Sequence, residues 1–325
     1  MTAAEAQHAL HETDLSAPAA LGYGLIADVT QWPLLFPPCL AARVLERSPG
    51  EERVRLWALA GGEVRTWTSV RQLDAERLRV GFRQDEPSPP VLAMSGSWSF
   101  VPALRGAGHS RLTLAHEWEV GGPAEVGDQI AVALDHNSRA EIDAVRSWTE
   151  RADPPEELLF SFSDQLPIKG EPHDVYTFLH RADRWPEYVP HVVGLNLRTD
   201  AEVLAGAEVQ RMEMATAAPD GTTHHSNSVR LCFPSTNIIY KQTTPPRGLL
   251  GHTGEWTIAP SDEGCVVTAG HRVALDPAAL SAFAGPGHDL AQARRVVRQR
   301  LGGNSMRTLE QARSFVEGHP RSAMR

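Results

Sequence analysis

The stretch Gly96-Ser-Trp98-Ser-Phe100-Val-Pro102 returns later in the chain as Gly254-Glu-Trp256-Thr-Ile258-Ala-Pro260. Further landmarks accompany both copies in the same order: Trp-Pro at 32–33 and 185–186, Ser-Val-Arg at 69–71 and 228–230, Thr-x-x-His at 113–116 and 268–271, and Leu-x-x-Asn-Ser at 134–138 and 301–305. Any one match could arise by chance, whereas the ordered set predicts that the chain contains one domain twice.

The length and charge of the chain narrow the possible classes of protein. Its 325 residues suit two domains, and its formal net charge of −9 argues against nucleic-acid binding. We place the boundary in Arg151–Glu157, where two prolines interrupt helical geometry, and expect domains over 1–153 and 154–325. Three scattered cysteines exclude a disulfide framework. Without a long apolar run, we expect a cytoplasmic protein that does not enter the membrane.

Both halves show the same order of expected elements. A strand (6–15 and 157–166) precedes short helices around the Trp-Pro pair, several strands follow, and a long helix (127–151 and 288–317) closes each half. The long helices carry apolar residues at helical spacing: Ile130, Leu134, Ile142, Val145 and Trp148, then Val297, Leu301, Leu309, Ala312 and Phe315. This order predicts an α+β fold, present twice, in which a curved antiparallel sheet grips the closing helix around an internal pocket.

The strand at 64–73 is the most informative for chemistry, because alternate residues of a strand face opposite sides of the sheet. Trp67, Ser69 and Arg71 share one face, and Ser228 and Arg230 share the matching face of the second copy. A buried arginine is costly without a partner. It is therefore either paired structurally or directed at an anionic or polarised ligand oxygen, and the pattern alone does not choose between these interpretations.

The remaining candidate residues also have two interpretations each. Tryptophans are core residues or walls for a flat ligand, histidines are structural unless they face a cavity, and helical asparagines cap strand backbone or enter the pocket: Trp32, Trp98, Trp185, Trp256, His116, His271, Asn137 and Asn304. The histidines lack H-x-x-x-H spacing, and Cys39 has no base beside it in sequence. We therefore expect neither a metal site nor a thiol nucleophile.

Four segments together resemble the aromatase/cyclases of bacterial type II polyketide synthases: Ala27–Phe36, Trp67–Arg71, Met94–Trp98 and Asn137-Ser138. The duplicated length resembles the di-domain members of that family. The resemblance implies two tandem helix-grip domains of the START/Bet v 1-like fold. It also implies first-ring aldol cyclisation and dehydration of a ketoreduced poly-β-ketone. The expected partners are the acyl carrier protein that bears this chain and other synthase subunits, and no cofactor is expected.

The resemblance also implies roles for individual residues. Catalysis is expected from Arg71, which would polarise a carbonyl or enolate oxygen, with Ser69 and, for proton transfer, His116. Substrate-binding residues are expected at Trp32, Phe36, Trp67, Met94, Trp98 and Asn137, and a second pocket at Trp185, Ser228, Arg230, Trp256, His271 and Asn304. Single-domain members carry a pocket tyrosine where this chain has Cys39 and Val192. This chain therefore has no phenolic acid at that position, and the resemblance does not carry over that part of the mechanism.

The two halves are not expected to be equally active, because Ser226 replaces Trp67 in the second copy. We therefore favour the N-terminal pocket as the active one, with a C-terminal half that is either a second site or structural. Two other functions are open from sequence: a non-enzymatic carrier of a lipid or aromatic ligand, and a scaffolding subunit. A carrier's cavity can be wholly apolar, so a buried arginine without a carboxylate partner beside a serine favours catalysis.

Overall fold

The computed structural model describes residues 6–103, 106, 108–217 and 221–318, and the chain divides into two compact units, Met1–Pro155 and Glu156–Arg325. Each unit contains one seven-stranded antiparallel sheet and one long C-terminal helix. Both units have the predicted helix-grip architecture, and we refer to them as the N-terminal and C-terminal domains. No helix in the described part of the chain is long and apolar enough to cross a membrane.

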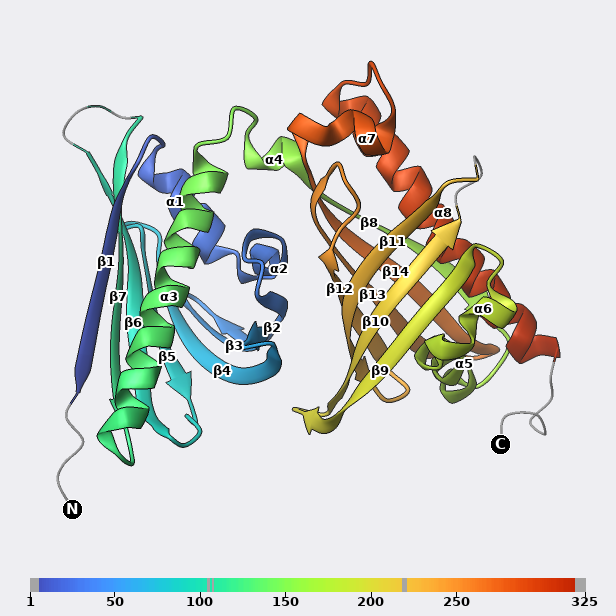
Figure 1. Ribbon diagram of the computed structural model, residues 1–325, viewed down its shortest axis with the longest axis horizontal. Coiled ribbons are helices and arrows are strands. Elements are labelled where there is room, and N and C mark those ends of the chain that lie inside the picture. Colours follow the sequence, from blue (N-terminus) through green and yellow to red (C-terminus); the bar gives the residue numbers. More distant parts are fainter. Residues whose placement is uncertain (1–5, 104–105, 107, 218–220, 319–325) are drawn as a thin grey trace. The chain divides into compact units, whose positions relative to one another are not determined.

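The N-terminal sheet has the strand order β1-β7-β6-β5-β4-β3-β2 (Figure 1). Its strands are β1 (Gln7–Leu15), β2 (Cys39–Ser48), β3 (Glu51–Ala60), β4 (Glu63–Asp74), β5 (Arg79–Asp85), β6 (Val91–Pro102) and β7 (Ser110–Val120). The helices are α1 (Ala19–Ala27), the 3-10 helix η1 (Val29–Gln31), α2 (Trp32–Leu35) and α3 (Ala124–Thr149). The long helix α3 packs against β1 and β7, as the apolar stripe through Leu134 and Ile142 predicts.

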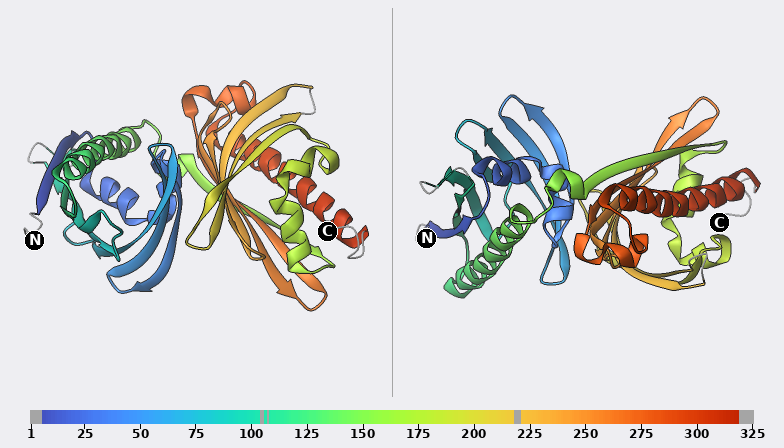
Figure 2. Two further views of the ribbon diagram at one scale, coloured as in Figure 1. Left: turned by 60° about the horizontal axis from the view of Figure 1, so that its bottom comes forward. Right: turned by 90° about the horizontal axis from the view of Figure 1, so that it is seen from above.

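The C-terminal sheet repeats this topology with the order β8-β14-β13-β12-β11-β10-β9. Its strands are β8 (Leu159–Ile168), β9 (Val192–Leu204), β10 (Ala207–Ala217), β11 (Thr223–Phe233), β12 (Asn237–Thr244), β13 (Leu249–Ser261) and β14 (Gly264–Leu275). The helices are α4 (Pro155–Leu158), α5 (Pro172–His180), η2 (Ala182–Arg184), α6 (Trp185–Tyr188), η3 (Pro277–Ala279), α7 (Leu280–Ala284) and α8 (Leu290–Gly318). Figure 2 shows each sheet curving around its long helix.

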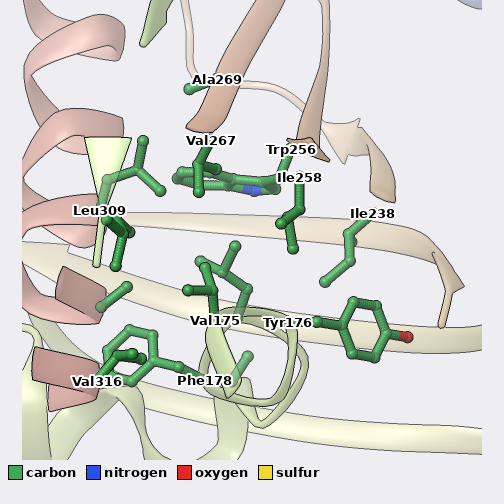
Figure 3. Packing of buried hydrophobic residues seen from close by; sticks show 14 of the residues in the cluster. Val175, Tyr176, Phe178, Ile238, Trp256, Ile258, Val267, Ala269, Leu309 and Val316 are labelled. Carbon is green, nitrogen blue, oxygen red and sulfur yellow. The ribbon is translucent and has the colours of Figure 1, made fainter. Parts of the chain in front are cut away.

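The helix α8 begins where a reciprocal cap satisfies its first backbone groups. The Gln292 backbone nitrogen donates to the Asp289 carboxylate at 2.7 Å, and the Asp289 backbone nitrogen donates to the Gln292 side-chain oxygen at 2.9 Å. Along the helix, Leu309 and Val316 turn toward the sheet. Figure 3 shows them in the core of the C-terminal domain together with side chains from α5, β12, β13 and β14.

Candidate active sites

The N-terminal domain encloses a cavity of about 330 Å³ between the sheet, α2 and α3. All nine residues predicted for the first site line it: Trp32, Phe36, Trp67, Ser69, Arg71, Met94, Trp98, His116 and Asn137. The strand β4 supplies three of these residues at every second position, as the alternation of a strand requires. Aromatic rings form much of the wall, and the polar groups lie among them. The cavity therefore has the composition of a small-molecule site.

Arg71 is almost completely buried, at 1 % exposure, and is held by protein groups on several sides. Its Nη1 donates to Glu52 Oε1 at 2.5 Å and to the Ala27 carbonyl at 3.4 Å, while Nη2 donates to the Ile26 carbonyl. Its guanidinium lies 4.9 Å from the centre of the Trp32 ring. Because Ile26 and Ala27 end α1, the arginine binds carbonyl groups that a helix C-terminus leaves without partners.

The expectation of an arginine without a carboxylate partner is therefore wrong for Arg71. Glu52 lies directly opposite it on β3, so both side chains share the inner face of the sheet. Burial lowers the pKa of Arg71, and the neighbouring Glu52 carboxylate acts against this shift. The Nε atom of Arg71 is buried and has no hydrogen-bond partner among the described residues.

His116 faces the cavity and is neutral near pH 7. Its Nδ1 lies 3.4 Å from the Ser138 hydroxyl, and its ring packs edge-on against Phe82. Burial, with a smaller effect from His11, lowers the pKa of His116 to about 4. A neutral imidazole beside a hydroxyl can pass a proton in either direction, but it is a weak base on its own.

Glu141 is a cavity residue that the sequence reasoning missed. It lies on α3 one turn beyond Asn137 and lines the same cavity. Burial raises the pKa of Glu141 to about 7. A carboxyl group with this pKa can donate or accept a proton at neutral pH. Helical spacing from Leu134 and Asn137 was the signal that could have identified it.

The C-terminal domain contains an inner chamber of about 100 Å³ and an outer one of about 560 Å³. All six predicted residues line the inner chamber: Trp185, Ser228, Arg230, Trp256, His271 and Asn304. The two chambers adjoin, because both are lined by Met214, Thr216, Gln242, Leu301 and Asn304. Ser226, which replaces Trp67, lines the outer chamber. The smaller side chain is consistent with the larger space there.

Arg230 keeps the backbone contacts of its N-terminal counterpart but has a different side-chain neighbour. It donates to the carbonyls of Leu179 at 2.5 Å and His180 at 3.4 Å, at the C-terminal end of α5. The residue opposite it on β10 is Gln210, where the N-terminal domain has Glu52. Among the described residues, no carboxylate lies within ion-pair distance of Arg230. The predicted arginine without a carboxylate partner is thus found in the second pocket.

Comparisons with known proteins support the same assignment of both halves. Residues 15–139 match the model of the family described as polyketide cyclase/dehydrase and lipid transport. The chain is 43 % identical to the actinorhodin polyketide synthase bifunctional cyclase/dehydratase of Streptomyces coelicolor, over 93 % of this chain and 95 % of that one. It is 41 % identical to the granaticin counterpart of Streptomyces violaceoruber, over 93 % and 92 %.

Solved structures resemble the whole chain as well. The crystal structure of the di-domain aromatase/cyclase BexL matches with a TM-score of 0.81 and 39 % identity, over 97 % of this chain and all of that one. StfQ, from the steffimycin biosynthetic pathway, matches with a TM-score of 0.77 and 33 % identity, over 95 % and 98 %. Relatives of this kind are cyclisation and dehydration enzymes by name, which separates the chain from simple lipid carriers. The chain belongs to the di-domain aromatase/cyclases of bacterial type II polyketide synthases.

Proposed function

We propose that the N-terminal cavity directs the first-ring aldol cyclisation of a ketoreduced poly-β-ketone on an acyl carrier protein, and then aromatises that ring by removing water. The observation that carries this proposal is the arrangement of Ser69, Arg71, His116 and Glu141 around one aromatic-walled cavity. An aromatic wall suits the flat ring that the reaction produces. A cavity of about 330 Å³ suits the cyclising part of the chain.

In this mechanism Arg71 stabilises the negative charge that develops on an oxygen of the substrate. An enol carbon of the poly-β-ketone attacks a ketone carbon of the same chain, and negative charge develops on the ketone oxygen. The Arg71 guanidinium and the Ser69 hydroxyl, which both line the cavity, stabilise that oxygen, which then takes up a proton. Arginine stays protonated, so it cannot serve as the base.

Proton transfer is assigned to His116 and Glu141. Dehydration removes an α-proton and protonates the departing hydroxyl group, so that one water leaves and a carbon–carbon double bond forms. Ionised Glu141, with a pKa near neutrality, accepts the α-proton, and the neutral His116–Ser138 pair passes a proton to the leaving oxygen. The proton on Glu141 then returns to that pair, so each group regains its starting protonation state. Trp32, Trp67 and Trp98 hold the reacting segment folded, which lowers the entropic cost of ring closure.

Reconstitution with the minimal synthase and a ketoreductase tests the assignment. We expect Ser69→Ala and Glu141→Gln to lower the yield of aromatised first-ring product by tenfold or more, and Arg71→Ala to lower it by about 100-fold. Because Arg71 also holds α1, thermal unfolding of each variant must accompany the assay. The control is Arg77→Ala, an exposed arginine outside both cavities, which should match the unmodified chain. Full aromatisation by a folded Arg71→Ala protein, together with loss of product in Arg230→Ala, would place first-ring closure in the C-terminal pocket instead.

A further inference from the structure

A series of hydrogen bonds in the C-terminal pocket connects Ser305, His271, His252 and Gln242. Ser305 Oγ lies 3.0 Å from His271 Nε2, His271 Nδ1 lies 3.0 Å from His252 Nε2, and His252 Nδ1 lies 2.8 Å from Gln242 Oε1. The Tyr240 hydroxyl approaches His271 Nδ1 at 3.5 Å. His252 and His271 are each 3 % exposed, so these contacts are shielded from bulk water.

This series of hydrogen bonds determines which nitrogen of each histidine carries the proton. Gln242 Oε1 can only accept, so His252 Nδ1 donates to it and His252 Nε2 is left to accept from His271 Nδ1. His271 Nε2 then carries the lone pair, which accepts the Ser305 hydroxyl at the chamber wall. Burial lowers the pKa of both rings, that of His271 to about 4. Both imidazoles are therefore neutral at physiological pH, and His271 presents an unprotonated nitrogen.

The equivalent positions in the N-terminal cavity are apolar. Tyr240 pairs with Gly254 across the sheet as Phe82 pairs with Gly96, so the two rings are counterparts. His252 lies two residues before Gly254, where the N-terminal domain has Met94 two residues before Gly96. A structural core does not need these polar groups, because the first copy packs the same positions with carbon and sulfur. The second copy has therefore gained an acid and a histidine that holds His271.

Three groups with complementary chemistry thus line one chamber. Arg230 contributes a buried guanidinium that forms no direct ion pair with a carboxylate among the described residues, and a buried charge of this kind favours an anionic oxygen. Burial raises the pKa of Tyr240, which therefore remains a neutral proton donor. The adjoining outer chamber, lined by Ser226 rather than a tryptophan, provides space for the rest of a ligand.

We propose that the C-terminal pocket is a second proton-transfer site, in which His271 removes the α-proton of a β-hydroxy ketone and Tyr240 protonates its departing hydroxyl group. Arg230 binds the enolate oxygen formed between these events. The electrons of the broken C–H bond become the new double bond, and one water leaves. The proton on His271 Nε2 then returns to Tyr240 through the Ser305 hydroxyl, which contacts both groups, so His271 regains its starting tautomer. His252 is a positioning residue that keeps His271 in the reactive tautomer. The substrate class rests on the function proposed above.

The test uses the full chain in the reconstituted synthase and separates cyclisation from dehydration by mass. Tyr240→Phe and His252→Met copy the residues of the N-terminal domain, so they preserve packing. We expect Tyr240→Phe and His271→Ala to slow dehydration about 100-fold and His252→Met about tenfold. First-ring product that is one water heavier than that of the unmodified chain should accumulate in all three, because it keeps a hydroxyl group that the C-terminal pocket removes, distinct from the one lost in the N-terminal cavity. His288→Ala, an exposed histidine outside both chambers, is the control and should match the unmodified chain.

A readout of the tautomer distinguishes positioning from mere stability. In ¹⁵N spectra, His271 should carry its proton on Nδ1 in the unmodified chain and populate both tautomers in His252→Met, with a shifted pH profile of dehydration. Unchanged dehydration in folded Tyr240→Phe and His271→Ala proteins would overturn the second site while leaving the N-terminal assignment intact. Loss of activity in Ser305→Ala together with labelling of Ser305 by a serine-directed phosphonate would instead identify acyl transfer. If variants of neither pocket altered the products, the proposed function itself would be wrong.

Discussion

Arg71 and Arg230 show how one residue can keep its structural task while its chemistry changes. Both are 1 % exposed, and both bind the last carbonyls of a helix and stack near a tryptophan. Opposite them, however, stand Glu52 in one domain and Gln210 in the other. The first arginine is therefore ion-paired with Glu52, which also binds Arg47, whereas the second forms no ion pair with a carboxylate among the described residues. A single substitution on the neighbouring strand separates the two pockets electrostatically.

The raised pKa of Glu141 predicts how the free energy of unfolding depends on pH. Its pKa is raised from the ordinary 4.5 to about 7 in the folded protein. Between these values the unfolded chain loses this proton and the folded chain keeps it, so stability falls as pH rises from about 4.5 to 7. The full shift corresponds to about 3 kcal/mol, and we expect about 2 because the side chain is partly exposed. Urea unfolding of Glu141→Gln across this range should lack that decline.

The control for this measurement is Glu125→Gln, at the exposed start of α3, which should keep the pH dependence of the unmodified chain. An unchanged pH dependence in Glu141→Gln would mean that Glu141 is ionised in the folded protein at neutral pH. It would then act only as a base from the start of the reaction, rather than as a group that exchanges a proton.

At the scale of elements, the alternation of residues along β4 predicted which of its side chains face the cavity. The apolar residues at helical spacing on α3 predicted which side of that helix does so. The pairing of Arg71 with Glu52 could also be predicted from the sequence, through the turn that connects their strands. Gly61 and Gly62 have positive φ values and form the turn between β3 and β4. A two-residue turn there pairs residues whose numbers add to 123, which places Glu52 opposite Arg71. The backbone contacts of Arg71 could not be predicted, because α1 meets the sheet only in the folded domain.

Substitutions of Glu52 test how β3 and β4 hold the end of α1 through Arg71. Glu52→Ala leaves the buried guanidinium without its carboxylate, and we expect it to lower the free energy of unfolding by about 3–5 kcal/mol. Glu52→Gln reproduces the arrangement beside Arg230 and should cost clearly less. Thermal unfolding followed by circular dichroism measures both. Glu46→Ala, on the exposed part of β2, is the control. Equal losses in the Ala and Gln variants would show that the charge of Glu52 is essential to the clamp.

At the scale of the whole molecule, the internal repeat predicted the two domains and their common topology. It could not predict their unequal chemistry, because a duplication copies landmarks such as Ser-Val-Arg but not the residues between them. His252 and Tyr240 lie among those unmatched positions. They could be identified only when strand pairing brought them beside His271.

Because each domain has its own hydrophobic core, we expect the two domains to unfold in separate thermal transitions. Ile142 of α3 is 5 % exposed and Leu309 of α8 is completely buried, each within its own domain. We expect Ile142→Ala and Leu309→Ala each to cost about 2–5 kcal/mol and to shift a different transition in a calorimetric scan. The matched pair serves as mutual control. A single transition that moves equally in both variants would show that the domains unfold together.

The missing carboxylate beside Arg230 also determines how the two pockets respond to dissolved salts. Glu52 forms an ion pair with Arg71, which weakens the attraction of that guanidinium for inorganic anions in the N-terminal cavity. The unbalanced guanidinium of the C-terminal pocket attracts chloride and phosphate as well as an enolate, and these ions compete for the same place. We therefore expect rising chloride or phosphate to inhibit the C-terminal pocket more strongly than the N-terminal one in the reconstituted assay. Two copies of one fold thus respond differently to the same solution.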